Sequence, residues 1–210
     1  MEIKTRIVLP DGVLNVLNSV YNSKRRHYHT ANHINRMLDS FREIAQSSNT
    51  ITLEVWNWDV FQAAILFHDI VMFEDNCEEK SAKVARILME KQYLHYGKSG
   101  VEDLDTLERL IVATDYRKIA VDNFDEELIR DLDLEGLADP WEKYLESREL
   151  IRAEYPYPEY YDFEFVLRRK KFLQYMLEFP KIYSTKYFEH LEAKARENLQ
   201  RELDMYKGEE

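Results

Sequence analysis

Apolar residues recur at helical spacing along most of the chain, and the alternation typical of a β-strand is hard to find. The stretch "PDGVLNVLNSVYN" predicts a short first helix. A second helix is predicted by an apolar stripe with i, i+3, i+4 spacing, which consists of Ile34, Met37, Leu38, Phe41, Ile44 and Ala45. The next segment, "WDVFQAAILFHDIVMF", is apolar nearly all round and is therefore expected to be a central helix surrounded by others.

Polar residues mark where further helices begin and end. Asn76, followed by Glu79, predicts an N-cap with its N3 partner, and that helix is expected to stop at Gly97. Asp139 followed by Pro140 predicts the start of another helix. More helices are predicted in "EDLDTLERLIVATDY", "DEELIRDLDLEGL", "FVLRRKKFLQYMLEF" and "TKYFEHLEAKARENLQRELDMY". The one candidate linker, "YPYPEYY", has apolar stripes on both sides, so we expect a single all-α helical bundle over residues 1–210.

The composition favours a helical protein of the cytoplasm. Only five Gly and five Pro occur in 210 residues, of which 33% are charged, and a chain of this length can bury a self-sufficient core. Cys77 is the single cysteine, which excludes an intramolecular disulfide and fits a reducing compartment. No secretory signal is recognised at the start, and the longest apolar run is too short to cross a bilayer. We therefore expect a cytoplasmic protein without a membrane span.

The net charge narrows the class of partner. A formal charge of -11 disfavours binding to DNA or RNA polymers, whose affinity depends on cationic side chains that neutralise phosphates. A small anionic substrate remains compatible with the sequence if positive charge is concentrated locally. The densest basic cluster near the histidine-rich start of the second helix is Lys24, Arg25 and Arg26, which could bind phosphate. The alternative is a solvated charge run before a helix.

Histidine and aspartate are the residues that could carry chemistry. His68 and Asp69 lie in an otherwise apolar segment, where ionisable groups are costly unless they are paired or bind a metal. If a helix starts near Tyr28, then His29 and His33 lie one turn apart on one face and can address a common site. Imidazoles and carboxylates from separate helices are typical of metal centres in helical bundles. The alternative is that His68 and Asp69 only cap or hydrogen-bond neighbouring helices.

The order of these residues resembles the HD-domain superfamily of metal-dependent phosphohydrolases. A His, a His-Asp doublet about one helix later and a distant Asp bind a divalent metal in that family, and here they correspond to His33, His68, Asp69 and a late Asp. Asp133 is preferred for the late position because "DLDL" resembles the family's ending, and Asp131 is the alternative. The resemblance implies a metal such as Mn, Fe, Co, Zn or Mg. One ion is expected, because His95 is the only histidine between the doublet and the late Asp.

The motif "YHTANH" is similar to the Tyr-His-Asn-x-x-His motif of the cyclic-nucleotide phosphodiesterases. In those relatives the first His protonates the leaving group and the second binds metal, so the resemblance implies that His29 is the general acid and His33 a ligand. Asp69 would also orient or deprotonate the attacking water. His27, the third histidine of the stretch, is expected to be a solvated neighbour. The resemblance extends to an uncharacterised subgroup of HD proteins, from about residue 20 to the end, in segments such as "FHDIVM", "EEKSA" and "ARENLQREL".

The resulting prediction is a metal-dependent phosphohydrolase that acts on a nucleotide or another small phosphorylated molecule. Two rival readings stay open: a non-catalytic HD fold that binds metal or nucleotide for regulation, and an oxygen-using di-iron protein, which needs more ligands than can be assigned. Glu78 and Glu79 could add a carboxylate, although helix capping explains at least one of them. "RRKK", residues 168–171, is better explained as the charged face of a helix than as a phosphate patch. The sequence assigns neither the substrate nor the oligomeric state.

Overall fold

The computed structural model describes residues 1–47, 55–94, 98–117, 123–155 and 161–207, and these ranges contain helices and no strand. The all-α prediction is therefore confirmed. The chain divides into two compact units, Met1–Leu132 and Asp133–Glu210, and the division falls inside a helix. The prediction of one domain over residues 1–210 stays a prediction, and the candidate linker lies largely outside the described residues. None of the described helices has both the length and the apolar character that a bilayer crossing requires.

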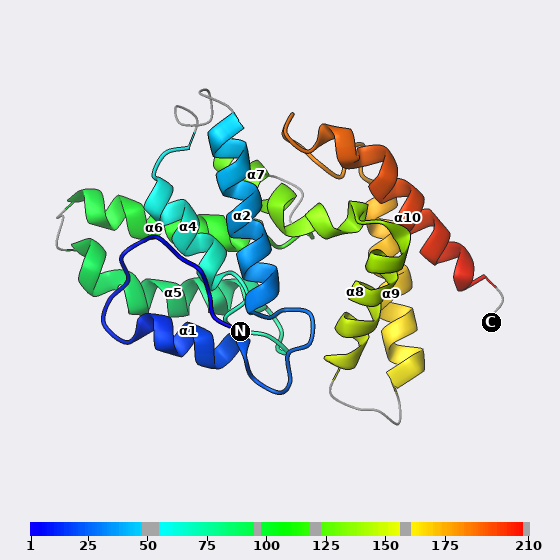
Figure 1. Ribbon diagram of the computed structural model, residues 1–210, viewed down its shortest axis with the longest axis horizontal. Coiled ribbons are helices and arrows are strands. Elements are labelled where there is room, and N and C mark those ends of the chain that lie inside the picture. The colour runs from blue at the N-terminus through cyan, green and yellow to red at the C-terminus, as the bar shows by residue number, and fades with distance from the viewer. Residues whose placement is uncertain (48–54, 95–97, 118–122, 156–160, 208–210) are drawn as a thin grey trace. The chain divides into compact units, whose positions relative to one another are not determined.

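The first unit is built around the predicted central helix, α4 (Trp58–Phe67). All residues from Val60 to Phe67 are buried, and α2 (Ala31–Ser47), α5 (Cys77–Tyr93) and α6 (Lys98–Ala113) pack against α4 (Figure 1). The side chain of Asn57 caps the start of α4 by accepting hydrogen bonds from Asp59 N and Val60 N, at 3.0 and 3.3 Å. The pattern had predicted that His68 and Asp69 lie inside this helix. The helix instead ends at Phe67, and the two residues follow it.

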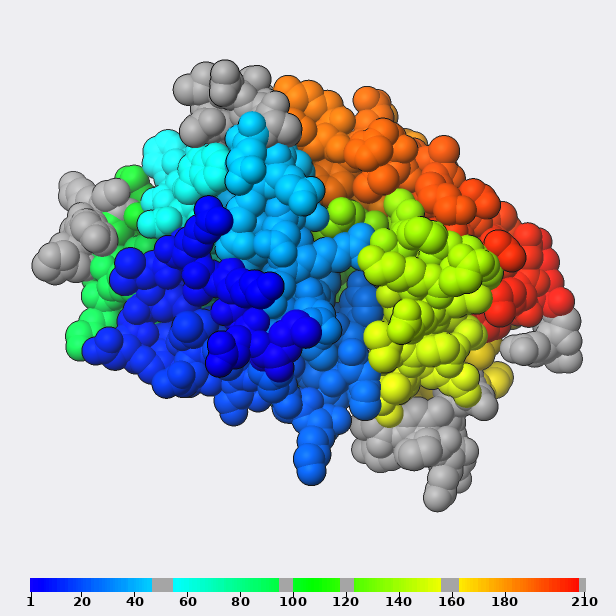
Figure 2. All heavy atoms as spheres, in the orientation of Figure 1, coloured from blue at the N-terminus to red at the C-terminus, as the bar shows by residue number. Residues whose placement is uncertain are grey.

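The N-terminal segment closes one side of this unit by hydrogen bonding rather than by secondary structure. Its backbone is held by Asn18 of α1 (Val13–Tyr21) and by Asn35 of α2: Ile3 N donates to Asn18 Oδ1 at 2.9 Å and Lys4 N to Asn35 Oδ1 at 2.7 Å. Arg42 of α2 donates to the carbonyl of Lys4 at 2.7 Å. Figure 2 shows this segment in dark blue, beside the lighter blue of α2. Two asparagines thereby satisfy backbone groups that no helix or sheet pairs.

The start and end of α5 differ from the sequence prediction. Asn76 precedes α5 in a left-handed conformation with φ of 56°, and its side chain makes no capping hydrogen bond, so the predicted capping box is wrong. The helix ends at Tyr93 rather than at Gly97, which lies outside the described residues. Helices α5 and α6 pack closely: a Cβ added at Gly100 would lie 1.8 Å from the carbonyl oxygen of Tyr93. Only glycine permits this approach of the two backbones.

The second unit consists of α8 (Trp141–Ala153), α9 (Tyr161–Glu178) and α10 (Glu192–Met205), with short 3-10 helices η2 (Glu135–Ala138) and η4 (Glu189–Leu191). Helix α8 begins after Pro140, as predicted, and the carboxylate of Asp139 pairs with Lys143 at 3.2 Å. Helix α10 begins at Glu192, because the residues before it form η4 and turns. The prediction of one continuous helix from Thr185 is therefore wrong.

A buried carboxylate joins the three long helices of this unit. Glu202 of α10 is fully buried and its carboxylate receives Arg169 Nη2 of α9 at 2.9 Å and Arg148 Nε of α8 at 3.2 Å. The hydroxyl groups of Tyr144 and Tyr206 donate to the same carboxylate. Burial raises the pKa of Glu202, but the hydrogen bond and charge of Arg169 outweigh it, and the net pKa lies below the ordinary value. Arg169 is thus part of the core of this unit and not of an exposed phosphate patch.

Candidate metal centre

His33 reaches the site from the first turn of α2. This helix starts at Ala31, and its buried residues Ile34, Met37, Leu38 and Phe41 face the core as predicted. His33 lies next to that apolar stripe and is 7% exposed. Burial of the imidazole within the first turn of a packed helix fixes its position, which suits a ligand.

His68 is oriented by a hydrogen bond to the last turn of α4. Its Nδ1 lies 2.9 Å from the carbonyl oxygen of Ile65, and because a carbonyl only accepts, Nδ1 carries the proton and donates. The lone pair of the neutral ring is then on Nε2, which faces His33 Nε2 at 3.3 Å. A backbone carbonyl that fixes the tautomer in this way is the usual support of a metal-binding histidine. His68 is 2% exposed, so its orientation is set by the fold.

Asp69 supplies a carboxylate beside the two imidazoles. Its Oδ2 lies 2.9 Å from His68 Nε2 and 3.8 Å from His33 Nε2. Although burial alone would raise the pKa of Asp69, its electrostatic interactions with the imidazoles of His68, His29 and His33 hold the pKa below its ordinary value. Oδ2 is buried, and in the tautomer of His68 that is protonated on Nδ1 the nearby Nε2 has no hydrogen to donate to this oxygen. A buried carboxylate oxygen in this state indicates an absent cationic partner.

Asp133 completes the group from the last turn of α7 (Phe124–Leu134), most of which belongs to the first unit. Ligand atoms of His33, His68 and Asp133 all lie within 4.8 Å of one another. Arg130, on the same helix, ties α7 to the end of α6 by donating to the carbonyls of Ala113 and Asp115, at 2.9 and 3.3 Å. The group contains Asp133 and not the fully buried Asp131, in agreement with the preferred late ligand.

The spacing of these atoms fits one metal ion. Two ligand atoms that each lie about 2.1 Å from one cation are about 3.0 Å apart at a right angle and about 3.4 Å apart at a tetrahedral angle. The observed separations of His68 Nε2 from Asp69 Oδ2 and from His33 Nε2 are 2.9 and 3.3 Å. Imidazole and carboxylate donors together suit Mn, Fe, Co or Zn. A His33, His68 and Asp133 group that can hold a metal ion is therefore present, and its metal is not identified by geometry alone.

His29 lies next to this group but not on the helix that carries His33. Helix α2 starts two residues later, so the prediction that the two histidines share one helical face is wrong. His29 lies in the turn before α2, where its ring centroid is 4.9 Å from Tyr28 and 6.0 Å from His33. Its charge contributes to the lowered pKa of Asp69, which places an ionisable imidazole within electrostatic reach of the carboxylate.

The basic cluster before α2 is divided by the fold. Lys24 and Arg25 are exposed, and the Arg25 guanidinium lies over the ring of Phe73 at 4.7 Å. Arg26 is 8% exposed and donates to the carbonyls of His29 and Ile70, at 3.1 and 3.0 Å. Arg26 thus connects the His29 turn to the segment after His68-Asp69. The predicted phosphate-binding role of all three stays a prediction, and Lys24 and Arg25 are its exposed members.

A charged cluster near the site joins Glu78, which the sequence offered as an additional carboxylate, to Asp115 and Arg117, which the sequence did not identify. Arg117 pairs with Asp115 at 2.7 Å and with Glu78, in the first turn of α5, at 3.4 Å. Burial raises the pKa of Glu78, and the charge of Asp115 adds to this effect. Asp69 and Glu78 both raise the pKa of the neighbouring Cys77, although burial is the main cause. The segment "VATDYRK" holds two of these residues but no periodic signal that would place them beside α5.

Other residues of the histidine set lie apart from the group or outside the description. His27 is exposed, as expected for a solvated neighbour, and His95 falls outside the described residues.

Comparison of the chain with protein-family models, with curated proteins and with solved structures finds no match in any of the three. The site therefore has to be interpreted from its own geometry.

Proposed function

We propose that the protein is a metal-dependent phosphohydrolase of the HD type, which cleaves a phosphoester of a nucleotide or another small phosphorylated molecule. The observation that carries the proposal is the group of His33, His68 and Asp133, whose ligand atoms lie within 4.8 Å of one another, with the Asp69 carboxylate 2.9 Å from His68 Nε2. These are the four residues that the resemblance to the HD superfamily assigns to the metal.

His33, His68, Asp69 and Asp133 would hold one divalent ion. When bound, such an ion lowers the pKa of a coordinated water and polarises a phosphoryl oxygen. The lowered pKa keeps Asp69 ionised at neutral pH, and this supports a role as ligand and hydrogen-bond acceptor that orients the water rather than as a strong base.

His29 is the proposed proton donor. Hydrolysis forms a bond between the water oxygen and phosphorus and breaks the bond between phosphorus and the leaving oxygen, which needs a proton. An imidazole changes its charge near neutral pH and can supply that proton. The exposed Lys24 and Arg25 would bind the negative charge of the substrate.

A phosphoester panel tests the reaction. The purified protein is assayed for phosphate release with Mn, Fe, Co, Zn or Mg, in parallel with His29→Ala and with His27→Ala, an exposed histidine two residues away. We expect turnover in the wild type and in His27→Ala, and a loss of about 100-fold or more in His29→Ala, the usual contribution of a general acid. Metal binding without phosphate release from any ester would reject the hydrolase and favour the regulatory module.

A further inference from the structure

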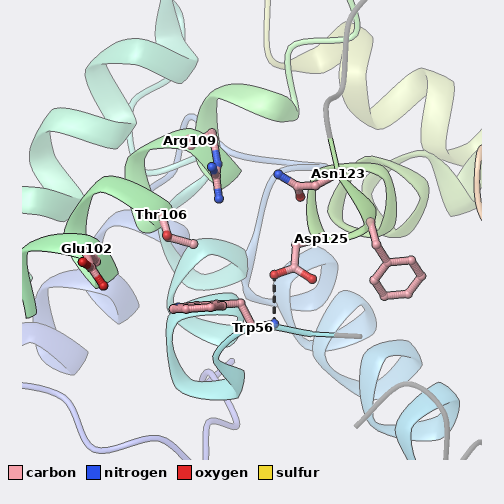
Figure 3. Close-up of a pocket in the computed structure, with 7 residues that line it drawn as sticks. Trp56, Glu102, Thr106, Arg109, Asn123 and Asp125 are labelled. Carbon is pink, nitrogen blue, oxygen red and sulfur yellow. Dashed lines mark hydrogen bonds between the residues drawn. The ribbon is translucent and has the colours of Figure 1, made fainter. Parts of the chain in front are cut away.

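A cavity of about 450 Å³ opens in the first unit at the other end of α7 from Asp133. Six of its lining residues are labelled in Figure 3: Trp56, Glu102, Thr106, Arg109, Asn123 and Asp125. Glu102, Thr106 and Arg109 come from α6, whereas Asn123 and Asp125 lie at the start of α7. Asp125 and Asp133 are eight residues apart, or about 12 Å along a helix. The cavity is thus separate from the metal centre, and its volume is typical of small-molecule sites.

Asp125 is the buried carboxylate of this cavity. Asp125 is 5% exposed. Its Oδ2 accepts a hydrogen bond from the backbone N–H of Trp56 at 3.2 Å, drawn as a dashed line in Figure 3. Oδ1 is buried and has no hydrogen-bond partner among the described residues. An ionised carboxylate offers about four acceptor positions, so most of its capacity is unused within the described residues. Burial raises the pKa of Asp125, which reflects a charge that lacks compensation.

Arg109, the one cation among the described residues that line the cavity, is already engaged by another carboxylate. Arg109 Nε lies 2.9 Å from Glu126 Oε1, and the amide of Asn123 donates to the same oxygen at 2.9 Å. The charge of Arg109 lowers the pKa of Asp125 without removing the effect of burial. Glu102 adds a second, exposed carboxylate to the lining. The described lining residues therefore carry more carboxylates than cations, and one of these carboxylates is buried.

Trp56 adds an open aromatic surface to this acidic cavity. The residue is 70% exposed, although its backbone is fixed by the hydrogen bond to Asp125. Exposure of a large aromatic side chain next to a cavity is typical of ligand recognition. A planar cation can stack on an indole while its N–H groups donate to a carboxylate, and guanidinium is the group that does both.

We propose that this cavity binds the guanidinium group of a small organic cation, which stacks on Trp56 and donates hydrogen bonds to Asp125. The proposal does not depend on the metal centre or on phosphoester hydrolysis. Two features of the cavity indicate this ligand: the exposed indole face of Trp56 and the Asp125 carboxylate, whose Oδ1 has no hydrogen-bond partner among the described residues. The volume of the cavity favours a free small molecule as the source of the guanidinium group. The alternative source is an arginine side chain of another protein, and the test distinguishes the two.

The test is a titration of the full chain with agmatine, followed by the indole N–H signal of Trp56 in two-dimensional NMR. The signal is assigned by its loss in Trp56→Phe. The matched ligand is the urea analogue of agmatine, which has the same length and the same amine but no guanidinium charge. We expect a saturable shift with agmatine and none with the urea analogue.

Variants of the protein complete the test. Asp125→Asn should weaken agmatine binding by about tenfold or more, since it removes the charge from the hydrogen-bonded pair. Trp56→Ala, at a 70% exposed position, should weaken binding without altering the fold. Asp105→Asn is the control, because Asp105 lies on α6, pairs with Arg86 at 2.8 Å and does not line the cavity. Binding in this control should equal that of the wild type.

Three results would overturn the proposal. The first is an unshifted Trp56 signal up to the solubility limit of agmatine, and the second is an equal response to the urea analogue. The third is undiminished agmatine binding in the folded Asp125→Asn and Trp56→Ala variants. A titration with a short arginine-containing peptide is run in parallel, and binding of the peptide without binding of agmatine would reject the small-molecule source.

Discussion

Replacement of Asp133 or Asp131 by asparagine separates the late metal ligand from its neighbour two residues away. Asp133 contributes an atom to the group with His33 and His68, whose ligand atoms lie within 4.8 Å of one another, whereas Asp131 is fully buried and is not part of that group. Asp133→Asn should therefore abolish stabilisation by metal while leaving the metal-free fold largely unchanged. Asp131→Asn should lower the stability of the metal-free protein but leave the response to metal intact.

The expected size of the response follows from mass action. A metal at 100 times its dissociation constant stabilises the folded state by about 2.7 kcal/mol. For a chain of 150 to 250 residues, each kcal/mol raises the melting temperature by about 2 to 4 °C, so the shift in the wild type should be about 5 to 11 °C. The stability decrease in Asp131→Asn should be about 1 to 3 kcal/mol, the penalty of disturbing a buried polar group.

The assay is differential scanning fluorimetry with and without each of the five metals. Asp131→Asn should keep a shift of the wild-type size from a lower starting temperature, and Asp133→Asn should show almost none. The reverse pattern, with the shift lost in Asp131→Asn and kept in Asp133→Asn, would refute the assignment of the late ligand. Equal shifts in both variants would refute the four-residue site.

Three further predictions concern the helices that position the sites. Glu202→Gln should destabilise the second unit by about 3 to 5 kcal/mol in urea denaturation, because Arg169 and Arg148 would lose a fully buried partner, and a change below about 1 kcal/mol would contradict this role. Since the folded pKa of Glu202 is lowered, its stabilisation is complete above the ordinary value of 4.5 and is lost as the pH falls below it, so the acid denaturation curve of Glu202→Gln should be flatter than that of the wild type. Gly100→Ala should destabilise the first unit by about 1 to 3 kcal/mol, because its Cβ would overlap the carbonyl oxygen of Tyr93, and an unchanged melting temperature would show that α5 and α6 can separate at little cost.

Helical periodicity and apolar content predicted the elements of the fold but not their ends. The segment before His68 is apolar all round, and α4 is indeed buried on every side. The helix ends at Phe67 with His68 as its C-cap, although the apolar pattern continues beyond this point. Asparagine is a residue type that often caps helices, yet Asn76 has a left-handed backbone and its side chain makes no capping hydrogen bond. Local sequence specifies the type of an element better than its terminal geometry.

The candidate site likewise has residues that the sequence predicted and contacts that only the structure shows. The sequence identified four candidate ligands, because each of them interrupts or flanks an apolar stripe: His33, His68, Asp69 and a late Asp. Arg26 was read as a surface cation, but the fold buries it against two carbonyls and the ring of Tyr21, at 4.9 Å. The carbonyl of Ile70 lies 44 residues away in the chain, so no local pattern could identify it as a partner of Arg26.

Some charged residues had no recognisable signal at all. Glu202 is one acidic residue in a charged helix, and Asp125 is one of three in the first turn of α7. Their burial is a property of tertiary packing, which single-sequence patterns do not encode.

The measurement that tests the account most directly is the metal content of the purified, tag-free protein by plasma mass spectrometry, compared with His68→Ala and Asp69→Ala. The account predicts about one divalent ion per chain in the wild type and its loss in both variants, while His27→Ala retains it. A wild-type protein that holds none of the five metals and takes up none on addition, or variants that hold as much metal as the wild type, would contradict the central claim that these residues form a metal centre.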